Sequence, residues 1–230
     1  MSARAMAIFD AASTRASYFT ALVIPIGAAL RYLNIGLPAP SGLQLAIFLI
    51  LLVVTTAFSL GLMINLCCPK MRIWPPPGKH SWKFWFVWIS YGTGAIGVSV
   101  IGVLDWGSLG LNHWSVPWIG TGLILFALPL SEWGVRTLNV HQTLGLKGQL
   151  LTSGPYGYIR NPQYVAEILI YLGAILITNS GMALTIGMLM MLWFLMAPFS
   201  EEPWLEKQFG KEYEDYCRRV PRFIGLRSGQ

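Results

Sequence analysis

The segment GPYGYIRNPQY (154–164) contains side chains suited to binding a small charged ligand, and EEP (201–203) supplies two carboxylates further along the chain. An apolar run follows Pro162, and proline is favoured in the first turn of a helix. Arg160 and Asn161 are therefore predicted at a helix N-terminus, where free backbone N–H groups and the helix dipole favour anionic groups. The forked guanidinium of Arg160 also suits a carboxylate. This segment is thus a candidate ligand site.

Each of these residues also has an explanation that involves no ligand. Arg160 fits a positively charged anchor at the end of a membrane span. An aromatic belt at the membrane interface accounts for three tyrosines, namely Tyr156, Tyr158 and Tyr164. Glu201 and Glu202 fit favourable charges in the first turn of a helix, with Ser200 as its N-cap. The occurrence of all these residues on one predicted face is what favours a site.

The composition predicts that the two segments belong to an all-α integral membrane protein with about six transmembrane helices. Of the 230 residues, 54% are hydrophobic and 11% are charged, and several apolar runs approach the roughly 20 residues that a helix needs to cross a bilayer. The candidate spans are 16–35, 44–67, 83–104, 115–134, 163–179 and 181–199. The last two should form a tight helical hairpin. The N-terminal stretch, which contains Asp10, does not have the pattern of a signal peptide.

Positive charge is concentrated in alternate connections, and the net charge of +6 reflects this clustering, not a surface for nucleic acid. The connections after the second and fourth spans carry lysines and arginines, as the termini do, whereas Asp105 and His113 occur in the connection after the third. The positive-inside rule therefore predicts that both termini and the candidate site face the cytoplasm. Glu132 and Glu167 lie near predicted cytoplasmic span ends, and Glu132 can pair with Arg136 four residues later. This pattern favours a site at the membrane boundary over a transport path.

Two further motifs carry little functional signal. GTGAIG (92–97) matches the dinucleotide-binding pattern G-x-G-x-x-G, but it lies inside an apolar span without a βαβ unit. Small residues in a membrane helix let neighbouring helices approach closely, so a packing role is expected. Cys67 and Cys68 are either a lipidation site at a span end or simply small residues, and the three cysteines form no disulfide framework. No metal site is predicted.

A third segment, WLEKQFGKEYEDYCRRVPRF (204–223), is predicted to form an amphipathic helix along the membrane or over the hairpin. Its apolar residues recur at helical spacing, namely Leu205, Phe209, Tyr213, Cys217 and Val220, with Tyr216 adjoining. GPYGYIRNPQYVA followed by EEPWLEKQFGKEYEDYCRRVPRF resembles the membrane methyltransferases typified by isoprenylcysteine carboxyl methyltransferase, to which phospholipid N-methyltransferases are related. The resemblance covers roughly residues 136–224.

The resemblance implies that S-adenosylmethionine binds between the final hairpin, the loop before it and the C-terminal segment. The residues that it implies for the cofactor pocket are His141, Gly154, Tyr156, Arg160, Asn161, Pro162, Tyr164, Glu201 and Glu202. Tyrosine faces would hold the sulfonium cation, and Glu201 would face the amino group or the ribose. Arg160 would hold a carboxylate of the cofactor or orient the acceptor, and both roles are open. Arg160 and Glu201 are therefore the candidate catalytic residues.

This chain departs from the family pattern at three positions. Asn161 replaces the usual histidine and has no titratable role, and Ala166 replaces a common glycine. Glu167 completes R-N-P-x-Y-x-x-E, which is similar to a motif of membrane steroid reductases that use NADPH. Those enzymes lack the Glu201–Glu202 pair. An NADPH-dependent reductase is one alternative function, and a non-enzymatic membrane scaffold is another.

The expected organisation is an N-terminal part (1–135) on the acceptor side and a cofactor-binding part (136–230). The acceptor is expected to be apolar or lipid-linked and to enter laterally from the bilayer. A prenylcysteine carboxylate, a phospholipid amine and a thiol all fit, and the sequence indicates neither the acceptor nor the oligomeric state. The proline-rich IWPPPGKHSW (73–82) is expected to be a rigid connector, or else a lid from which His80 touches the substrate.

Overall fold

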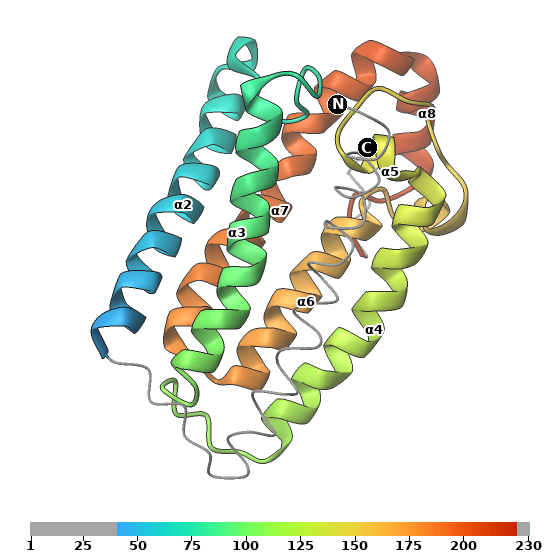
Figure 1. The fold of residues 1–230 in the computed structure, drawn as a ribbon. Coiled ribbons are helices and arrows are strands. Elements are labelled where there is room, and N and C mark those ends of the chain that lie inside the picture. Colours follow the sequence, from blue (N-terminus) through green and yellow to red (C-terminus); the bar gives the residue numbers. More distant parts are fainter. Residues whose placement is uncertain (1–40, 225–230) are drawn as a thin grey trace.

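A computed structural model describes residues 41–224 of the chain. The regular elements in this range are all helices, as predicted (Figure 1). The long helices are α2 (Ser41–Cys67), α3 (Trp82–Leu104), α4 (Ser115–Leu138), α6 (Pro162–Thr178) and α7 (Gly181–Phe209). The short ones are α5 (Val140–Thr143), α8 (Lys211–Arg219) and the 3₁₀ turns Pro69–Met71 and Gly154–Gly157.

Four of the described helices, α2, α3, α4 and α7, are long and apolar enough to cross a membrane. Helix α6 is apolar as well but has 17 residues. These helices confirm an integral, multi-pass membrane protein. The predicted span 16–35 lies outside the described residues, so the number of six spans stays a prediction.

The predicted hairpin of the last two spans is confirmed. Helix α6 begins at Pro162 and ends before Asn179, which has a left-handed backbone conformation (φ 51°). Ser180 then caps α7, because its side chain accepts a hydrogen bond from the backbone N–H of Ala183. Asp105, at the end of α3, accepts hydrogen bonds from the Ser180 hydroxyl at 2.6 Å and from Gln44 of α2 at 3.0 Å. These contacts fasten α2, α3 and the hairpin at the end of the bundle remote from the candidate site.

Close helix packing depends on glycine at three contacts between helices. Helices α4 and α6 cross where Gly120 meets Gly173, and a Cβ atom added at either residue would lie 2.6 Å from the backbone oxygen of the other. In GTGAIG, Gly94 packs on the Met190 side chain and Gly97 on Leu51. Because the motif lies in the middle of α3, its predicted packing role is confirmed.

Helix α7 is longer than predicted and contains the acidic pair in its interior. It continues through Pro198 and Pro203 to Phe209. The alternative in which Ser200 caps a new helix is therefore wrong, and the Ser200 hydroxyl donates to the Trp74 carbonyl at 2.7 Å instead. The predicted amphipathic helix is also divided, because Gly210, with φ +53°, ends α7 and lets α8 start in a new direction.

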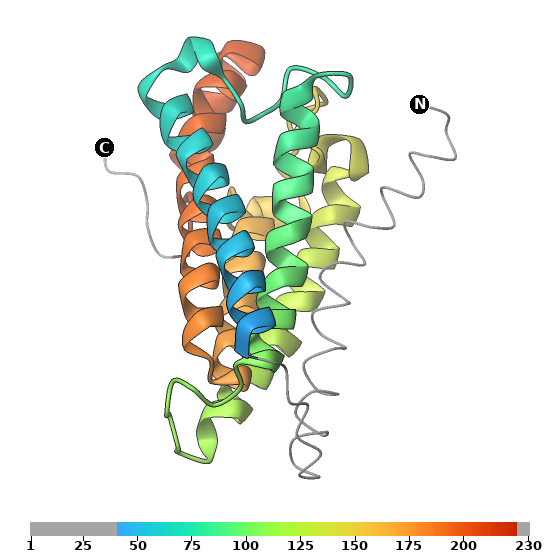
Figure 2. The same cartoon turned by 60° about the vertical axis from the view of Figure 1, so that its left-hand side comes forward.

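The helices form two packed groups that α6 and α7 join. Helix α4 packs mainly on α6, whereas α3 packs on α2, α7 and α6. Figure 2 shows α2 and α7 running side by side along the bundle. The C-terminal ends of α2, α4 and α7 and the N-terminal ends of α3 and α6 all lie at one end of the molecule, at the top of Figure 1. We call this the site end.

Candidate functional site

A cavity of about 1550 Å³, including its open mouth, lies at the site end. Its lining comes from α2, α3, α4, α6 and α7, from the loop before α6 and from α8. Residues that are far apart in the sequence therefore meet around one space.

The loop before α6 is held against α4 and α8. Gly154 begins the 3₁₀ turn with φ +59°, and a Cβ atom there would lie 2.9 Å from Oγ1 of Thr137. Tyr156 is buried, and its carbonyl accepts a hydrogen bond from the Tyr216 hydroxyl of α8 at 2.7 Å. Burial raises the pKa of Tyr156 well above its usual value, and the charge of Glu201 adds to this effect, so the phenol stays neutral.

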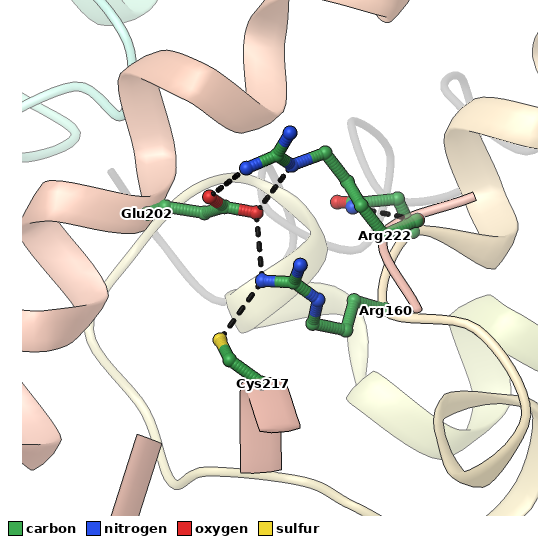
Figure 3. A network of polar contacts seen from close by, with 5 residues as sticks. Arg160, Glu202, Cys217 and Arg222 are labelled. Atoms are coloured by element: carbon green, nitrogen blue, oxygen red, sulfur yellow. Dashed lines mark hydrogen bonds and ion pairs between the residues drawn. The ribbon is translucent and has the colours of Figure 1, made fainter. Parts of the chain in front are cut away.

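Arg160 lies at the centre of a buried ion-pair network (Figure 3). Its Nη1 donates to Oε1 of Glu202 at 2.9 Å and to Sγ of Cys217 at 2.8 Å. Arg222 donates to the two oxygens of the same carboxylate, from Nε at 2.7 Å and from Nη2 at 2.6 Å. The side chains of Arg160, Glu202 and Arg222 are 4%, 15% and 25% exposed. The network joins the start of α6, the interior of α7, α8 and the segment after it.

Two local effects support this network. The hydrogen bonds from Arg222 to Glu202 raise the pKa of the Arg222 guanidinium, which stays charged. Burial raises the pKa of the Cys217 thiol, although the charge of Arg160 opposes the shift. Cys217 is therefore a neutral thiol at pH 7 and accepts a hydrogen bond from Arg160 without adding negative charge.

The segment after α8 is hydrogen-bonded to the residues just before α6. Its Pro221 carbonyl accepts a hydrogen bond from the backbone N–H of Arg160 at 2.9 Å. The Asn161 side chain donates to the Arg222 carbonyl at 3.1 Å, and it makes no capping bond to α6. Asn161, which replaces the histidine usual in the family, thus contacts the C-terminal segment through its side chain.

A second polar chain holds Glu201. The Tyr164 hydroxyl donates to Oε2 of Glu201 at 2.8 Å and accepts a hydrogen bond from Nε1 of Trp74 at 3.1 Å. Trp193 packs edge-on against both aromatic rings, with centroids 5.5 Å from Trp74 and 6.3 Å from Tyr164. The Glu201 carboxylate is therefore oriented beside a cluster of three aromatic rings, those of Trp74, Tyr164 and Trp193.

The structure brings together most of the predicted site residues. Those that line the cavity are Tyr156, Arg160, Asn161, Tyr164, Glu201 and Glu202. His141, Gly154 and Pro162 are not part of the lining. His141 is exposed, Gly154 packs on α4, and Pro162 is buried in the first turn of α6.

Sequence reasoning did not assign two residues of the site. Arg222 lies in the quoted C-terminal motif, where its neighbour Pro221 was the only local signal of a fixed backbone. Trp74 lies in the proline-rich connector and lines the cavity. The connector is thus packed into the fold at Trp74, whereas His80 is exposed and is not part of the lining.

Comparisons with known proteins support the resemblance. A family described as phospholipid methyltransferase matches residues 116–212. A protein-S-isoprenylcysteine O-methyltransferase of Schizosaccharomyces pombe is 35% identical over 78 residues, which are 34% of this chain and 33% of that protein. The match thus spans about a third of the length of that relative. No solved structure matches the chain.

The matched range, 116–212, runs from α4 through the cavity loop and hairpin to the start of α8. The chain is a multi-pass membrane protein, and its predicted resemblance to membrane methyltransferases of the isoprenylcysteine and phospholipid type is confirmed.

Proposed function

We propose that this chain is an S-adenosylmethionine-dependent methyltransferase that acts on an apolar or lipid-linked acceptor in the cavity at the site end. The observation that carries the proposal is the chemistry of the cavity lining inside the matched region. Carboxylates, an arginine and aromatic faces surround one space there. S-adenosylmethionine presents a sulfonium cation and an ammonium, so the aromatic faces and the carboxylates of the lining offer counterparts to its two positive groups.

The charge of the lining favours this cofactor over NADPH. Among the described lining residues the acidic ones are Glu132, Glu167, Glu201 and Glu202, and Arg160 is the basic one. Arg160 is already paired with Glu202, and Glu132 is paired with Arg136. A phosphate-rich dinucleotide would meet net negative charge in this cavity, whereas sites for NADP supply an arginine to the 2′-phosphate. S-adenosylmethionine carries a sulfonium and an ammonium, and both groups are attracted by the negative charge of the lining.

Each residue has a role that follows from its contacts. Glu201, held by Tyr164, would bind the ammonium or ribose of the cofactor, and the Tyr156, Tyr164 and Trp193 faces would border its cation. Arg160 lines the cavity but is fixed by Glu202 and Cys217, so we assign it mainly to positioning the start of α6. In-line transfer depends on such positioning.

The cofactor would supply a methyl group on a positively charged sulfur. The acceptor forms its bond to the methyl carbon with its own electron pair, while the carbon–sulfur electron pair stays on the sulfur. The apolar lining contributed by α3, α4 and α7 would keep water from this reaction. The enzyme's task is then to align the acceptor behind the methyl group, and no protein nucleophile is needed.

The test is ligand-dependent thermal stability of the purified full-length chain in detergent. S-adenosylhomocysteine should raise the unfolding midpoint in a saturable way, and NADPH at the same concentration should not. Glu201→Gln should weaken the S-adenosylhomocysteine effect about tenfold because it removes the charge that faces the ammonium, equivalent to about 1.4 kcal/mol. Glu206→Gln is the matched control, because Glu206 is exposed on the same helix and is not part of the lining.

Stabilisation by NADPH and not by S-adenosylhomocysteine would replace this proposal with the reductase. If neither ligand stabilises the chain, the remaining hypothesis is a non-enzymatic membrane scaffold.

A further inference from the structure

The connector between α2 and α3 (68–81) is positively charged and lies outside the cavity. Its basic residues, together with one in the first turn of α3, are Lys70, Arg72, Lys79 and Lys83. The stretch 68–104 holds no aspartate or glutamate. Both flanking helices are long and apolar enough to span a membrane, so the connector lies at an edge of the bilayer, at the site end (Figure 1). None of these basic residues lines the cavity, and the proposed methyl transfer gives them no role.

Arg72 has a half-buried guanidinium that is paired with no carboxylate. Its Cζ lies 5.7 Å from the ring centroid of Trp204 of α7, and burial lowers the pKa of Arg72. The ion pairs among residues 41–224 do not include this side chain. Partial removal of a charge from water is unfavourable unless an opposite charge accompanies it. An anion beside Arg72 would therefore stabilise this arrangement.

Lys83 is held next to Arg72. Its Nζ donates to the backbone carbonyl of Arg72 at 2.7 Å and to that of Met71 at 3.4 Å, and neither acceptor carries a charge. Lys70 is exposed in the 3₁₀ turn that precedes Arg72. The first turn of α3 contains no acidic residue to balance Lys83 or the positive end of the helix dipole. We call Lys70, Arg72 and Lys83 the connector cluster.

Apolar side chains accompany the connector cluster at the edge of the bilayer. Met71 is 57% exposed and lies between Lys70 and Arg72 in the chain, and Trp82, which is 65% exposed, precedes Lys83. The Nζ of Lys83 lies 6.0 Å from the ring centroid of Trp82. Tryptophan is enriched at the level of lipid headgroups. The cluster therefore combines positive charge with side chains that suit contact with lipid.

We propose that the connector cluster binds the phosphate of an anionic phospholipid from the surrounding bilayer. The fork of the Arg72 guanidinium matches two phosphate oxygens, and the lysines add charge beside it. Basic residues next to a membrane span gain most from lipids with net negative charge. A zwitterionic lipid gains less, because its own ammonium is repelled by the cluster. The exposed Met71 and Trp82 favour a lipid over a soluble phosphate, since they can contact the acyl chains.

The experiment compares two lipids on the full-length chain in nonionic detergent, with binding measured by native mass spectrometry. Dioleoylphosphatidylglycerol is anionic and dioleoylphosphatidylcholine is zwitterionic, and both carry the same acyl chains. The anionic lipid should bind about tenfold more tightly, and this preference should fall as salt is added. Glycerol phosphate at the same molar concentration should not displace the anionic lipid, because it has no acyl chains.

Variants of the connector cluster should lower this preference. Arg72→Gln combined with Lys83→Gln should reduce it to about twofold or less. Lys70→Gln alone should reduce it about threefold, and the exposed position of Lys70 makes this change tolerable to the fold. Arg72→Lys keeps the charge and should keep most of the preference. S-adenosylhomocysteine plays no part in these measurements, so the inference stands or fails independently of the proposed function.

The matched control removes two positive charges elsewhere at the site end. Lys211→Gln combined with Arg218→Gln changes exposed residues of α8 and should leave the preference for the anionic lipid unchanged. An equal reduction in this control would overturn the inference, because total charge would then explain the preference. Equal binding of the two lipids to the unaltered chain would also overturn it. Displacement of the lipid by glycerol phosphate would show a site for a soluble anion instead.

Discussion

Glu202 accepts hydrogen bonds from two guanidiniums that belong to different segments, Arg160 before α6 and Arg222 after α8. The side chains of this network are largely buried, so the two positive charges depend on one carboxylate. The network thus links the integrity of the site to a single residue. Neighbouring Glu201 has a separate partner, Tyr164, and a separate role.

We predict that Glu202→Gln destabilises the chain by about 3 kcal/mol, because removal of one partner leaves buried charge uncompensated. The unfolding midpoint in detergent should fall, and S-adenosylhomocysteine should bind more weakly because Arg160 and Arg222 no longer fix the loop and the C-terminal segment. Arg218→Ala is the control, since that side chain is 75% exposed and lies 3.7 Å from Asp215. An equal loss of stability in both variants would contradict this role of Glu202.

Some of the site residues could be predicted from local sequence and others could not. Pro162 and the apolar run after it predicted that Arg160 lies at the start of a helix. The two motifs predicted that Glu201 and Glu202 lie close to Arg160. The partners of Glu201 and Glu202 depend on contacts between distant segments. Tyr164 and Arg222 reach these carboxylates only because α6, α7 and α8 converge at one end.

At the scale of elements, hydrophobic length predicted the bounds of α2, α3, α4 and α6 to within a few residues. It failed at the end of α7, because the predicted span ends at residue 199 whereas the helix continues to Phe209. Packing of Ser200 on the Trp74 carbonyl and of the carboxylates on Tyr164 and the arginines supports the helix there. Such tertiary support is invisible to local propensity.

The crossing of α4 and α6 gives a prediction at this scale. Gly173→Val should destabilise the chain by about 2–3 kcal/mol, because the new side chain would collide with the backbone oxygen of Gly120, which cannot rotate away. Gly122→Val is the matched control, since nothing lies within 4 Å of a Cβ atom at that residue of α4. Both can be compared by thermal unfolding in detergent. A Gly173→Val variant as stable as the control would show that the helices do not need this close approach.

At the scale of the whole molecule, the chain separates an apolar bundle from a polar site end. The cytoplasmic position of this end stays a prediction of the positive-inside rule, since Lys70, Arg72 and Lys79 lie there and Asp105 and His113 lie at the other end. Both cysteines at the end of α2, Cys67 and Cys68, are exposed.

This orientation predicts an asymmetric reaction with a membrane-impermeant maleimide. In sealed membrane vesicles with the cytoplasmic face outward, the reagent should label Cys67 and Cys68. It should not label the thiol introduced by Asn112→Cys in a chain that also carries Cys67→Ser, Cys68→Ser and Cys217→Ser, until the vesicles are permeabilised. Asn112 is exposed at the opposite end. The reverse pattern would place the site on the other side of the membrane.

The central claim is that the cavity at the site end binds S-adenosylmethionine, and direct titration tests it. The full-length chain in detergent should bind radiolabelled S-adenosylmethionine at about one molecule per chain, and S-adenosylhomocysteine should displace the label whereas NADPH should not. Tyr164→Phe should weaken binding about tenfold, which corresponds to about 1.4 kcal/mol, because Glu201 loses the hydroxyl that orients it. Tyr158→Phe should not, since Tyr158 is 73% exposed. No saturable binding, or displacement by NADPH, would contradict the account.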